Sequence, residues 1–301
     1  MENLNNLSLF LLSDVNLDFI RLNLEKIKDI GLREIYSSEY GEYRQIFNSL
    51  KSNDNFNSSE YLFIWPSPEG VSNQFKNLKN HINYHHDKLL DDLSLYTERI
   101  LSLSLSKKAI FLPLLNKFDE FSNLGLGNMS KDIGYNATLH KVNSLLIDSF
   151  IDVENIYLMD SFDWFRQAKL PFDNKLWLRG KIPFSIEFMN ILSNAIKDYI
   201  HTLNIPHKKL LVLDLDNTIW GGVVGDDGWE NIKIGGHDFI GEAFLQFQIE
   251  IKKLKNRGLI LALCSKNEID VVEELFKKNE YMHLKYDDFF TVKINWNNKV
   301  E

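Results

Sequence analysis

Residues 210–222 read LLVLDLDNTIWGG, an apolar run that ends in two aspartates separated by a single residue. Four consecutive apolar residues are typical of a strand that is buried on both faces, as in a parallel sheet covered by helices. Alternate side chains of a strand leave on the same face, so Asp214 and Asp216 are expected to project together beyond its carboxyl end. Open α/β sheets bind their ligands at that end. The segment therefore predicts an α/β fold with a functional site after this strand.

The two carboxylates indicate a site for a divalent cation. Two acids that face the same way repel each other unless a cation or a phosphoryl group lies between them, and Mg²⁺ is the hard ion that such oxygen ligands favour. Asn217 and Thr218 are expected to begin the next turn, and Gly221 and Gly222 to let the backbone bend sharply or approach a ligand. The alternative is an acidic pair that only caps this turn.

A second apolar strand, LILALCSKN at residues 259–267, ends in a small hydroxyl residue. Ser265 suits a hydrogen bond to a phosphoryl oxygen, because the strand follows a helix at the spacing of a βαβ unit. Ser265 or Asn267 equally suits the N-cap of the helix predicted for EIDVVEELFKK, and the two interpretations are compatible. Cys264 is either a strand residue packed as a small hydrophobe or a thiol that carries an acyl group in transit.

An Asp-x-Asp-x-Thr sequence after an apolar strand resembles the first motif of the haloacid dehalogenase (HAD) superfamily, whose members are phosphotransferases with an aspartate nucleophile. WGGVVGDDGWENI, at residues 220–232, is similar to the FkbH-like branch of that superfamily. The resemblance implies that Asp214 attacks phosphorus and that Asp216 is the general acid and base. It also implies a magnesium site made by the Asp214 carboxylate and the main-chain carbonyl of Asp216.

The same resemblance extends to the remaining site residues. Ser265 would bind a phosphoryl oxygen, and Lys299, in the terminal INWNNK, would neutralise charge on the nucleophile and the phosphate. The residues expected to contact substrate are Asn217, Thr218, Cys264 and Asn267. HAD proteins also carry a fourth motif, an acidic pair on a further strand, and the sequence ends at Glu301 without one. We therefore expect an incomplete metal site, an unpaired sheet edge, and a chain that is a fragment or is completed by another chain.

FkbH-like proteins are associated with a three-carbon acyl phosphate. They take a glyceryl unit from 1,3-bisphosphoglycerate, remove the phosphate and load the acyl group onto the phosphopantetheine thiol of an acyl carrier protein. The sequence shows no large cap insertion between Asp216 and Ser265, which leaves a site open to a carrier-borne arm. An open site equally fits an ordinary magnesium-dependent phosphatase, and a non-catalytic binding or assembly module is the third alternative.

The first part of the chain alternates strands and helices from its start. The segments LSLFLLS, LREIYSSEY, YLFIWPS, AIFLPLL and IYLMD are predicted strands, and the helical segments between them imply a parallel sheet with right-handed crossovers. We expect one α/β domain over residues 1–181 and a connecting helix and linker over 182–207. A capless, incomplete HAD-like domain is expected over 208–301.

In FkbH-like proteins with an extra amino-terminal domain, that domain resembles the SGNH hydrolases, in which a Gly-Asp-Ser sequence follows the first strand. The corresponding residues here are Ser13-Asp14-Val15, and valine cannot act as a nucleophile. The sequence near Asp160, DSFDWF, provides no Asp-x-x-His. We therefore predict that this domain is catalytically degenerate. The pair His85-His86 is expected to lie on a solvated helix face, because adjacent helical side chains diverge too far to share a metal ion.

Composition excludes several classes of function. A formal net charge of -8 gives no electrostatic footprint for nucleic acid or an anionic membrane. A single cysteine excludes an internal disulfide framework and fits a reducing cytosol. The first residues, MENLNNLSLFLLSD, lack a basic leader, and the chain has no apolar run of the ~18 residues that a membrane helix needs. We expect a cytoplasmic protein that acts on a small phosphorylated substrate.

Overall fold

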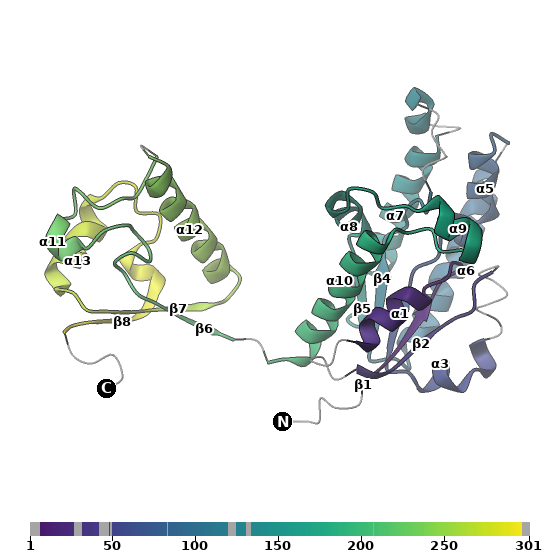
Figure 1. Cartoon of the computed structure of the whole chain (residues 1–301), viewed down its shortest axis with the longest axis horizontal. Helices are drawn as coiled ribbons and strands as arrows, with labels where there is room; N and C mark the ends of the chain where they lie inside the picture. The colour runs from purple at the N-terminus through teal and green to yellow at the C-terminus, as the bar shows by residue number, and fades with distance from the viewer. Residues whose placement is uncertain are drawn as a thin grey trace. The chain divides into compact units, whose positions relative to one another are not determined.

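The computed structural model describes residues 7–26, 32–41, 48, 50–82, 84–119, 125–130, 134–206, 208–236 and 238–296. The chain divides into two compact units, Met1–Ile205 and Pro206–Glu301. Each unit is built around its own parallel β-sheet with helices packed against it, as the α/β prediction requires (Figure 1). No helix among the described residues combines the length and the apolar character that crossing a membrane demands.

The first sheet has five strands in the order β2-β1-β3-β4-β5, and every neighbouring pair is parallel. The strands are β1 (Leu7–Leu12), β2 (Leu32–Ser37), β3 (Tyr61–Ile64), β4 (Ala109–Pro113) and β5 (Ile156–Met159). All five lie in the segments predicted from the sequence. Every residue of β1, β3 and β4 is buried, because helices cover both faces of the sheet.

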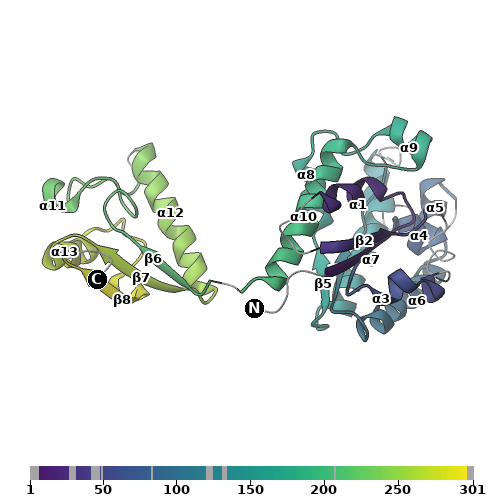
Figure 2. The ribbon, with the colours of Figure 1, turned by 60° about the horizontal axis from the view of Figure 1, so that its bottom comes forward.

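Alternate residues of the central strands enter two separate cores, one on each face. Leu62 belongs to the core beneath α5, α6 and α7, whereas Phe63 belongs to the core beneath α1, α8 and α10 (Figure 2). The helices of this unit among the described residues are α1 (Asp18–Glu25), α3 (Asp54–Ser58), α4 (Pro68–Val71), α5 (Asn73–Lys79), α6 (His86–Ser104), α7 (Tyr135–Phe150), α8 (Ser161–Gln167), α9 (Asn174–Gly180) and α10 (Ile186–Asn204). Two 3₁₀ turns, η1 (Leu50–Ser52) and η2 (Gly125–Met129), complete it.

Helix α10 belongs to the first unit. Ser185 caps it by accepting a hydrogen bond from Phe188 N, and the side chains of Phe188, Leu192 and Ile196 are completely buried against the first sheet. Their spacing of four residues places them on one helix face, which packs into the core instead of spanning two domains. The helix expected within the connecting segment 182–207 is present as α10, but it packs with the first unit, so the chain divides between Ile205 and Pro206 instead of at Lys181.

The second unit contains three parallel strands in the order β6-β7-β8, which are β6 (Leu210–Leu213), β7 (Ile260–Ser265) and β8 (Phe289–Ile294). Its helices are α11 (Val224–Asp227), α12 (Phe239–Asn256) and α13 (Ile269–Lys278), with a 3₁₀ turn, η3 (Tyr286–Asp288), before β8. One face of the sheet packs on α13 through Leu213, Leu263 and Leu275.

Strand β6 lies at the edge of this sheet. The side chains of Leu210 and Val212 are 53% and 55% exposed, while Leu213 is buried. The prediction of a strand buried on both faces is therefore wrong for the described residues, because only one face of this edge strand is covered there. The expected unpaired edge and apolar surface are observed in the same residues.

Candidate functional site

Asp214 and Asp216 follow β6 at the carboxyl end of the second sheet, where the adjacent strand β7 ends in Ser265. The Ser265 hydroxyl donates a hydrogen bond of 2.7 Å to Asp214 Oδ1, and the backbone N–H of Leu215 donates to the same oxygen at 2.9 Å. Parallel strands that are in register bring their carboxyl ends together, so residues that are 51 positions apart in sequence become direct partners. The structure thus joins the two strand ends that the sequence singled out.

Asp216 accepts three hydrogen bonds. The indole Nε1 of Trp220 and the backbone N–H of Val224 donate to its Oδ1 at 2.9 and 3.1 Å. The side-chain amide of Asn267 donates to its Oδ2 at 2.8 Å and to Ser265 Oγ at 3.3 Å. Every group bonded to this carboxyl is a donor, which is the set that a carboxylate anion accepts. The two aspartates, Ser265 and Asn267 therefore form one connected polar cluster.

The turn after Asp216 is held by local hydrogen bonds. Asn217 has a left-handed backbone with a φ of 52°, and its side-chain oxygen accepts from Gly222 N at 2.9 Å. Gly222 has a φ of 103°, and a Cβ there would lie 2.8 Å from Asp227 Oδ2, so the bend requires glycine. Thr218 donates to the carbonyl oxygen of Asp216 at 3.4 Å. Asn217 and Thr218 thus shape the turn on which Asp216 sits.

The capping interpretation of the second strand end is wrong. Helix α13 begins after Glu268, which makes no side-chain capping bond, whereas Ser265 and Asn267 direct their donors at the aspartates. Side chains alternate along a strand, so Cys264 projects to the opposite face of β7 from Ser265. Its thiol is free and half-buried. Lys299 lies outside the described residues, and its role stays a prediction.

The oxygen atoms of this cluster are candidate ligands for magnesium. Among the residues that the structure describes, no group of three or more His, Cys, Asp or Glu side chains could hold a metal ion. Mg²⁺ in phosphate sites uses one or two carboxylates and completes its six ligands with water and substrate oxygens. The Asp214 carboxylate and the Asp216 carbonyl fit that role, and they indicate a metal bound jointly with a phosphate.

The position of the first unit that corresponds to a hydrolase nucleophile is apolar and buried. Val15 is 4% exposed, and the preceding Ser13 donates its hydroxyl proton to the carbonyl of Trp65 at 2.7 Å within the core. Asp160 caps α8 by accepting from Phe162 N. Ser13 and Asp160 thus make structural contacts, and the catalytic degeneracy of this unit stays a prediction.

Comparisons with known proteins find similarity between this chain and solved structures. No protein-family model and no curated protein matches it. A solved structure from Bacteroides fragilis, the N-terminal part of a protein containing a phosphatase domain complexed with Mg, is 29% identical, and the match covers 98% of this chain and 78% of that chain with a TM-score of 0.77. This chain resembles a magnesium-complexed phosphatase. The similarity extends across both units, and it supports an enzymatic, hydrolase-type function.

Two esterases match a smaller part of the chain. A GDSL-like lipase from Bacteroides thetaiotaomicron is 12% identical over 67% of this chain and 91% of its own, with a TM-score of 0.40. An acetylxylan esterase from Geobacillus stearothermophilus is 11% identical over 66% of this chain and 96% of its own, with a TM-score of 0.43.

Proposed function

We propose that the second unit catalyses magnesium-dependent phosphoryl chemistry of the HAD type, with Asp214 as the nucleophile. The observation that carries the proposal is the 2.7 Å hydrogen bond from Ser265 to Asp214. It sets a donor suited to a phosphoryl oxygen beside the carboxylate that would attack phosphorus, at the strand ends where α/β sheets bind ligands. The 29% identity to a phosphatase-containing protein complexed with Mg supports the same chemistry.

In the first step, an oxygen of Asp214 forms a bond to phosphorus while the bond from phosphorus to the leaving oxygen breaks. Ser265 and Leu215 donate to Oδ1 of Asp214 and hold the attacking carboxylate in place. When a phosphate is present, the hydroxyl of Ser265 and the amide of Asn267 turn from the aspartates to its oxygens. Bound Mg²⁺ would offset the negative charge on the phosphate and orient it for attack.

In the second step, water attacks phosphorus and the bond to Asp214 breaks, which releases inorganic phosphate. Asp216 accepts the proton of this water through Oδ2, because Trp220 and Val224 hold Oδ1. An alkyl phosphate would need Asp216 to carry a proton for its leaving group at the first step. An acyl phosphate releases a carboxylate, which needs little protonation.

We propose further that the substrate is a three-carbon acyl phosphate of the 1,3-bisphosphoglycerate type and that an acyl carrier protein receives the acyl group. The resemblance of residues 220–232 to the FkbH-like branch supports this choice. In that transfer the carrier thiolate attacks the acyl carbon, the bond between this carbon and the phosphate oxygen breaks, and the C1 phosphate leaves. The two steps at Asp214 would then act on the phosphate ester at C3, whose hydrolysis leaves a glyceryl thioester. An ordinary phosphatase would instead pass the phosphoryl group to water.

The full chain, incubated with Mg²⁺, 1,3-bisphosphoglycerate and a phosphopantetheine-loaded carrier protein, separates these outcomes by intact-protein mass spectrometry. We expect the carrier to gain the mass of one glyceryl unit. Phosphate release with an unchanged carrier mass would reject the acyl transfer and retain the phosphatase. Asp214→Asn should abolish the phosphoryl chemistry, so that the carrier gains at most a 3-phosphoglyceryl unit, whereas Asp226→Asn, an exposed aspartate on α11, should leave both reactions intact. Full turnover by Asp214→Asn would reject the mechanism.

A further inference from the structure

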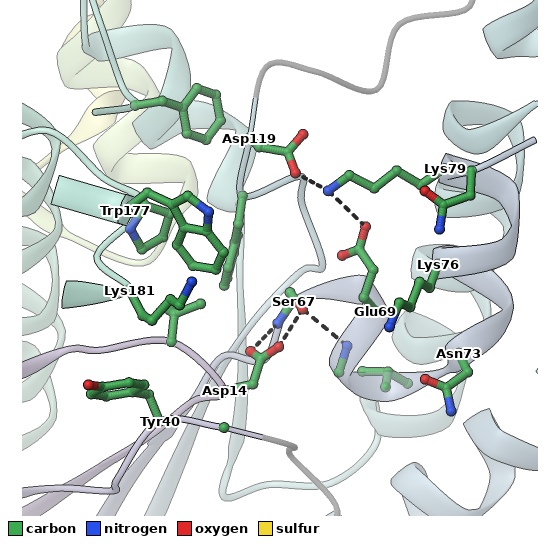
Figure 3. Close-up of a pocket in the computed structure, with 18 of the residues that line it drawn as sticks. Asp14, Tyr40, Ser67, Glu69, Asn73, Lys76, Lys79, Asp119, Trp177 and Lys181 are labelled. Atoms are coloured by element: carbon green, nitrogen blue, oxygen red, sulfur yellow. Dashed lines mark hydrogen bonds and ion pairs between the residues drawn. The ribbon is translucent and has the colours of Figure 1, made fainter. Parts of the chain in front are cut away.

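The first unit contains a cavity of about 810 Å³ at the carboxyl ends of its central strands (Figure 3). Its lining includes Asp14 after β1, Ser67 after β3 and Asp119 after β4. In the strand order β2-β1-β3-β4-β5, strands β1 and β3 are neighbours. From β1 the chain passes to β2 on one side of this pair, and from β3 it passes to β4 on the other side. The crevice between two such strands is the topological switch point at which parallel α/β sheets bind small molecules.

The floor of the cavity is a carboxyl group in a fixed position. Asp14 Oδ1 accepts from Ser67 N at 2.7 Å and Oδ2 accepts from the Ser67 hydroxyl at 2.5 Å. Gly70 permits this approach, because a Cβ at that residue would lie 2.7 Å from Asp14 Oδ2. Burial raises the pKa of Asp14, although the two bonds from Ser67 oppose the rise. A carboxyl at this position can exchange hydrogen bonds with a ligand hydroxyl.

One wall of the cavity is a satisfied ion network. Lys79, on α5, forms an ion pair with Asp119 and lies 3.6 Å from Glu69 Oε1, and Tyr135 donates its phenolic proton to Glu69 at 3.0 Å. Figure 3 shows Lys79 extended between the two carboxylates. The Lys79 ammonium offsets one of the two carboxylate charges, so the wall presents fixed hydrogen-bonding groups and keeps one negative charge.

The cavity also carries two cations that no carboxylate neutralises within the described residues. Lys76 lies on α5, and Lys181, just after α9, approaches from the opposite wall (Figure 3). Lys181 Nζ stands 4.7 Å from the centre of the Trp177 ring. Helix α9 buries none of its residues, and Trp177 remains 37% exposed where it lines the cavity. The cavity therefore combines an anion-attracting pair of lysines with an aromatic surface.

We propose that this cavity binds a phosphorylated polyol, a sugar phosphate that is either free or the ribose phosphate of a nucleotide. The phosphate lies between Lys76 and Lys181, because lysine ammonium groups bind phosphate as point charges. The hydroxyls of the sugar bond to Asp14 and to the acids of the ion network. Trp177 packs against the sugar ring or the base. Binding is non-covalent, and the proposal is independent of the phosphoryl chemistry assigned to the second unit.

Titration calorimetry of the full chain in EDTA tests the proposal, because chelation removes the metal needed by the second unit. The probes are ribose 5-phosphate, AMP, ribose and inorganic phosphate. We expect saturable binding of ribose 5-phosphate, with a change in tryptophan fluorescence that Trp177→Phe removes, and at least tenfold weaker binding of ribose and of phosphate. Tighter binding of AMP identifies the nucleotide as the source, and equal or weaker binding identifies the free sugar phosphate.

The matched variants are Lys76→Gln with Lys181→Gln, and Lys88→Gln as a control on an exposed lysine of α6 that does not line the cavity. The double variant should weaken ribose 5-phosphate at least tenfold, and the control should bind as the parent does. Absence of binding by all four probes overturns the proposal, and so does equal affinity of the double variant and the control. Magnesium-dependent phosphatase activity should be unchanged in the double variant, which separates this test from that of the second unit.

Discussion

At the scale of single residues, the proposed phosphoryl chemistry depends on hydrogen-bond donors that lie where they can bind a phosphate. Ser265 is 3% exposed, and its hydroxyl bonds to Asp214. Ser265→Ala should lower kcat for phosphate release roughly 10- to 100-fold, because one donor to the phosphoryl oxygens is lost. Ser265→Thr retains a hydroxyl and should recover part of the rate. Thr291→Ala, an exposed hydroxyl on β8, is the control. An unchanged kcat in Ser265→Ala would exclude this residue from the site.

The sequence predicts only those site residues that lie together in short, recognisable motifs. Asp214, Asp216 and Ser265 are found because each directly follows an apolar strand, and parallel strands end together. The bonds from Trp220 and Val224 to Asp216 are not predictable in this way, since they depend on the left-handed turn at residue 217.

The sequence does not predict the cavity of the first unit, for a related reason. Its residues come from segments far apart in the chain, and no local spacing connects Asp14 with Ser67 or Trp177. The one available signal is that Asp14 and Ser67 both stand just after predicted strands. Their adjacency becomes visible only once the strand order is known.

At the scale of elements, the sequence predicts the positions of strands better than it predicts how neighbouring elements pack on them. Every predicted strand is present, and all except β2 contain four or more apolar residues, which specify a strand locally. The exposure of one face of β6 and the packing of α10 on the first sheet depend instead on neighbouring elements. Strand β8 was not predicted, and its pattern FFTVKI mixes buried and exposed positions.

The start of β8 is anchored to α12 by Asp288. Burial acts to raise the pKa of Asp288, but hydrogen bonds from Lys252, Lys255 and the backbone of Lys285 outweigh it and lower the pKa from 3.8 to about 2. Because the folded pKa lies below the unfolded one, this carboxylate contributes stability above about pH 4 that is lost as the pH falls through 2. The contribution at neutral pH is about 2 kcal/mol.

Asp288→Asn should therefore destabilise the second unit by about 2 kcal/mol at pH 7 and should reduce the loss of stability between pH 4 and 2. Urea unfolding at a series of pH values measures both effects. Asp287→Asn, which changes the adjacent exposed aspartate, should behave as the parent does. Identical pH dependence of the two variants would contradict the anchoring role of Asp288.

At the scale of the whole molecule, the two units have separate cores. Leu192 of α10 is completely buried in the first unit, and Leu263 of β7 is 1% exposed in the second. Calorimetry of the full chain should show Leu192→Ala lowering one unfolding transition, at a cost of about 2–5 kcal/mol, and Leu263→Ala lowering the other. If each substitution lowered both transitions equally, the division at residue 205 would be wrong.

The central claim is that Asp214 attacks phosphorus, and a trapped covalent intermediate tests it most directly. The full chain is mixed with Mg²⁺ and radiolabelled acetyl phosphate, quenched in acid within one turnover, and digested for peptide mass spectrometry. We predict one hydroxylamine-sensitive phosphoryl group on Asp214, absent from Asp214→Asn and retained in Asp226→Asn. A phosphoryl group on any other residue, or none while phosphate is being released, would contradict the account.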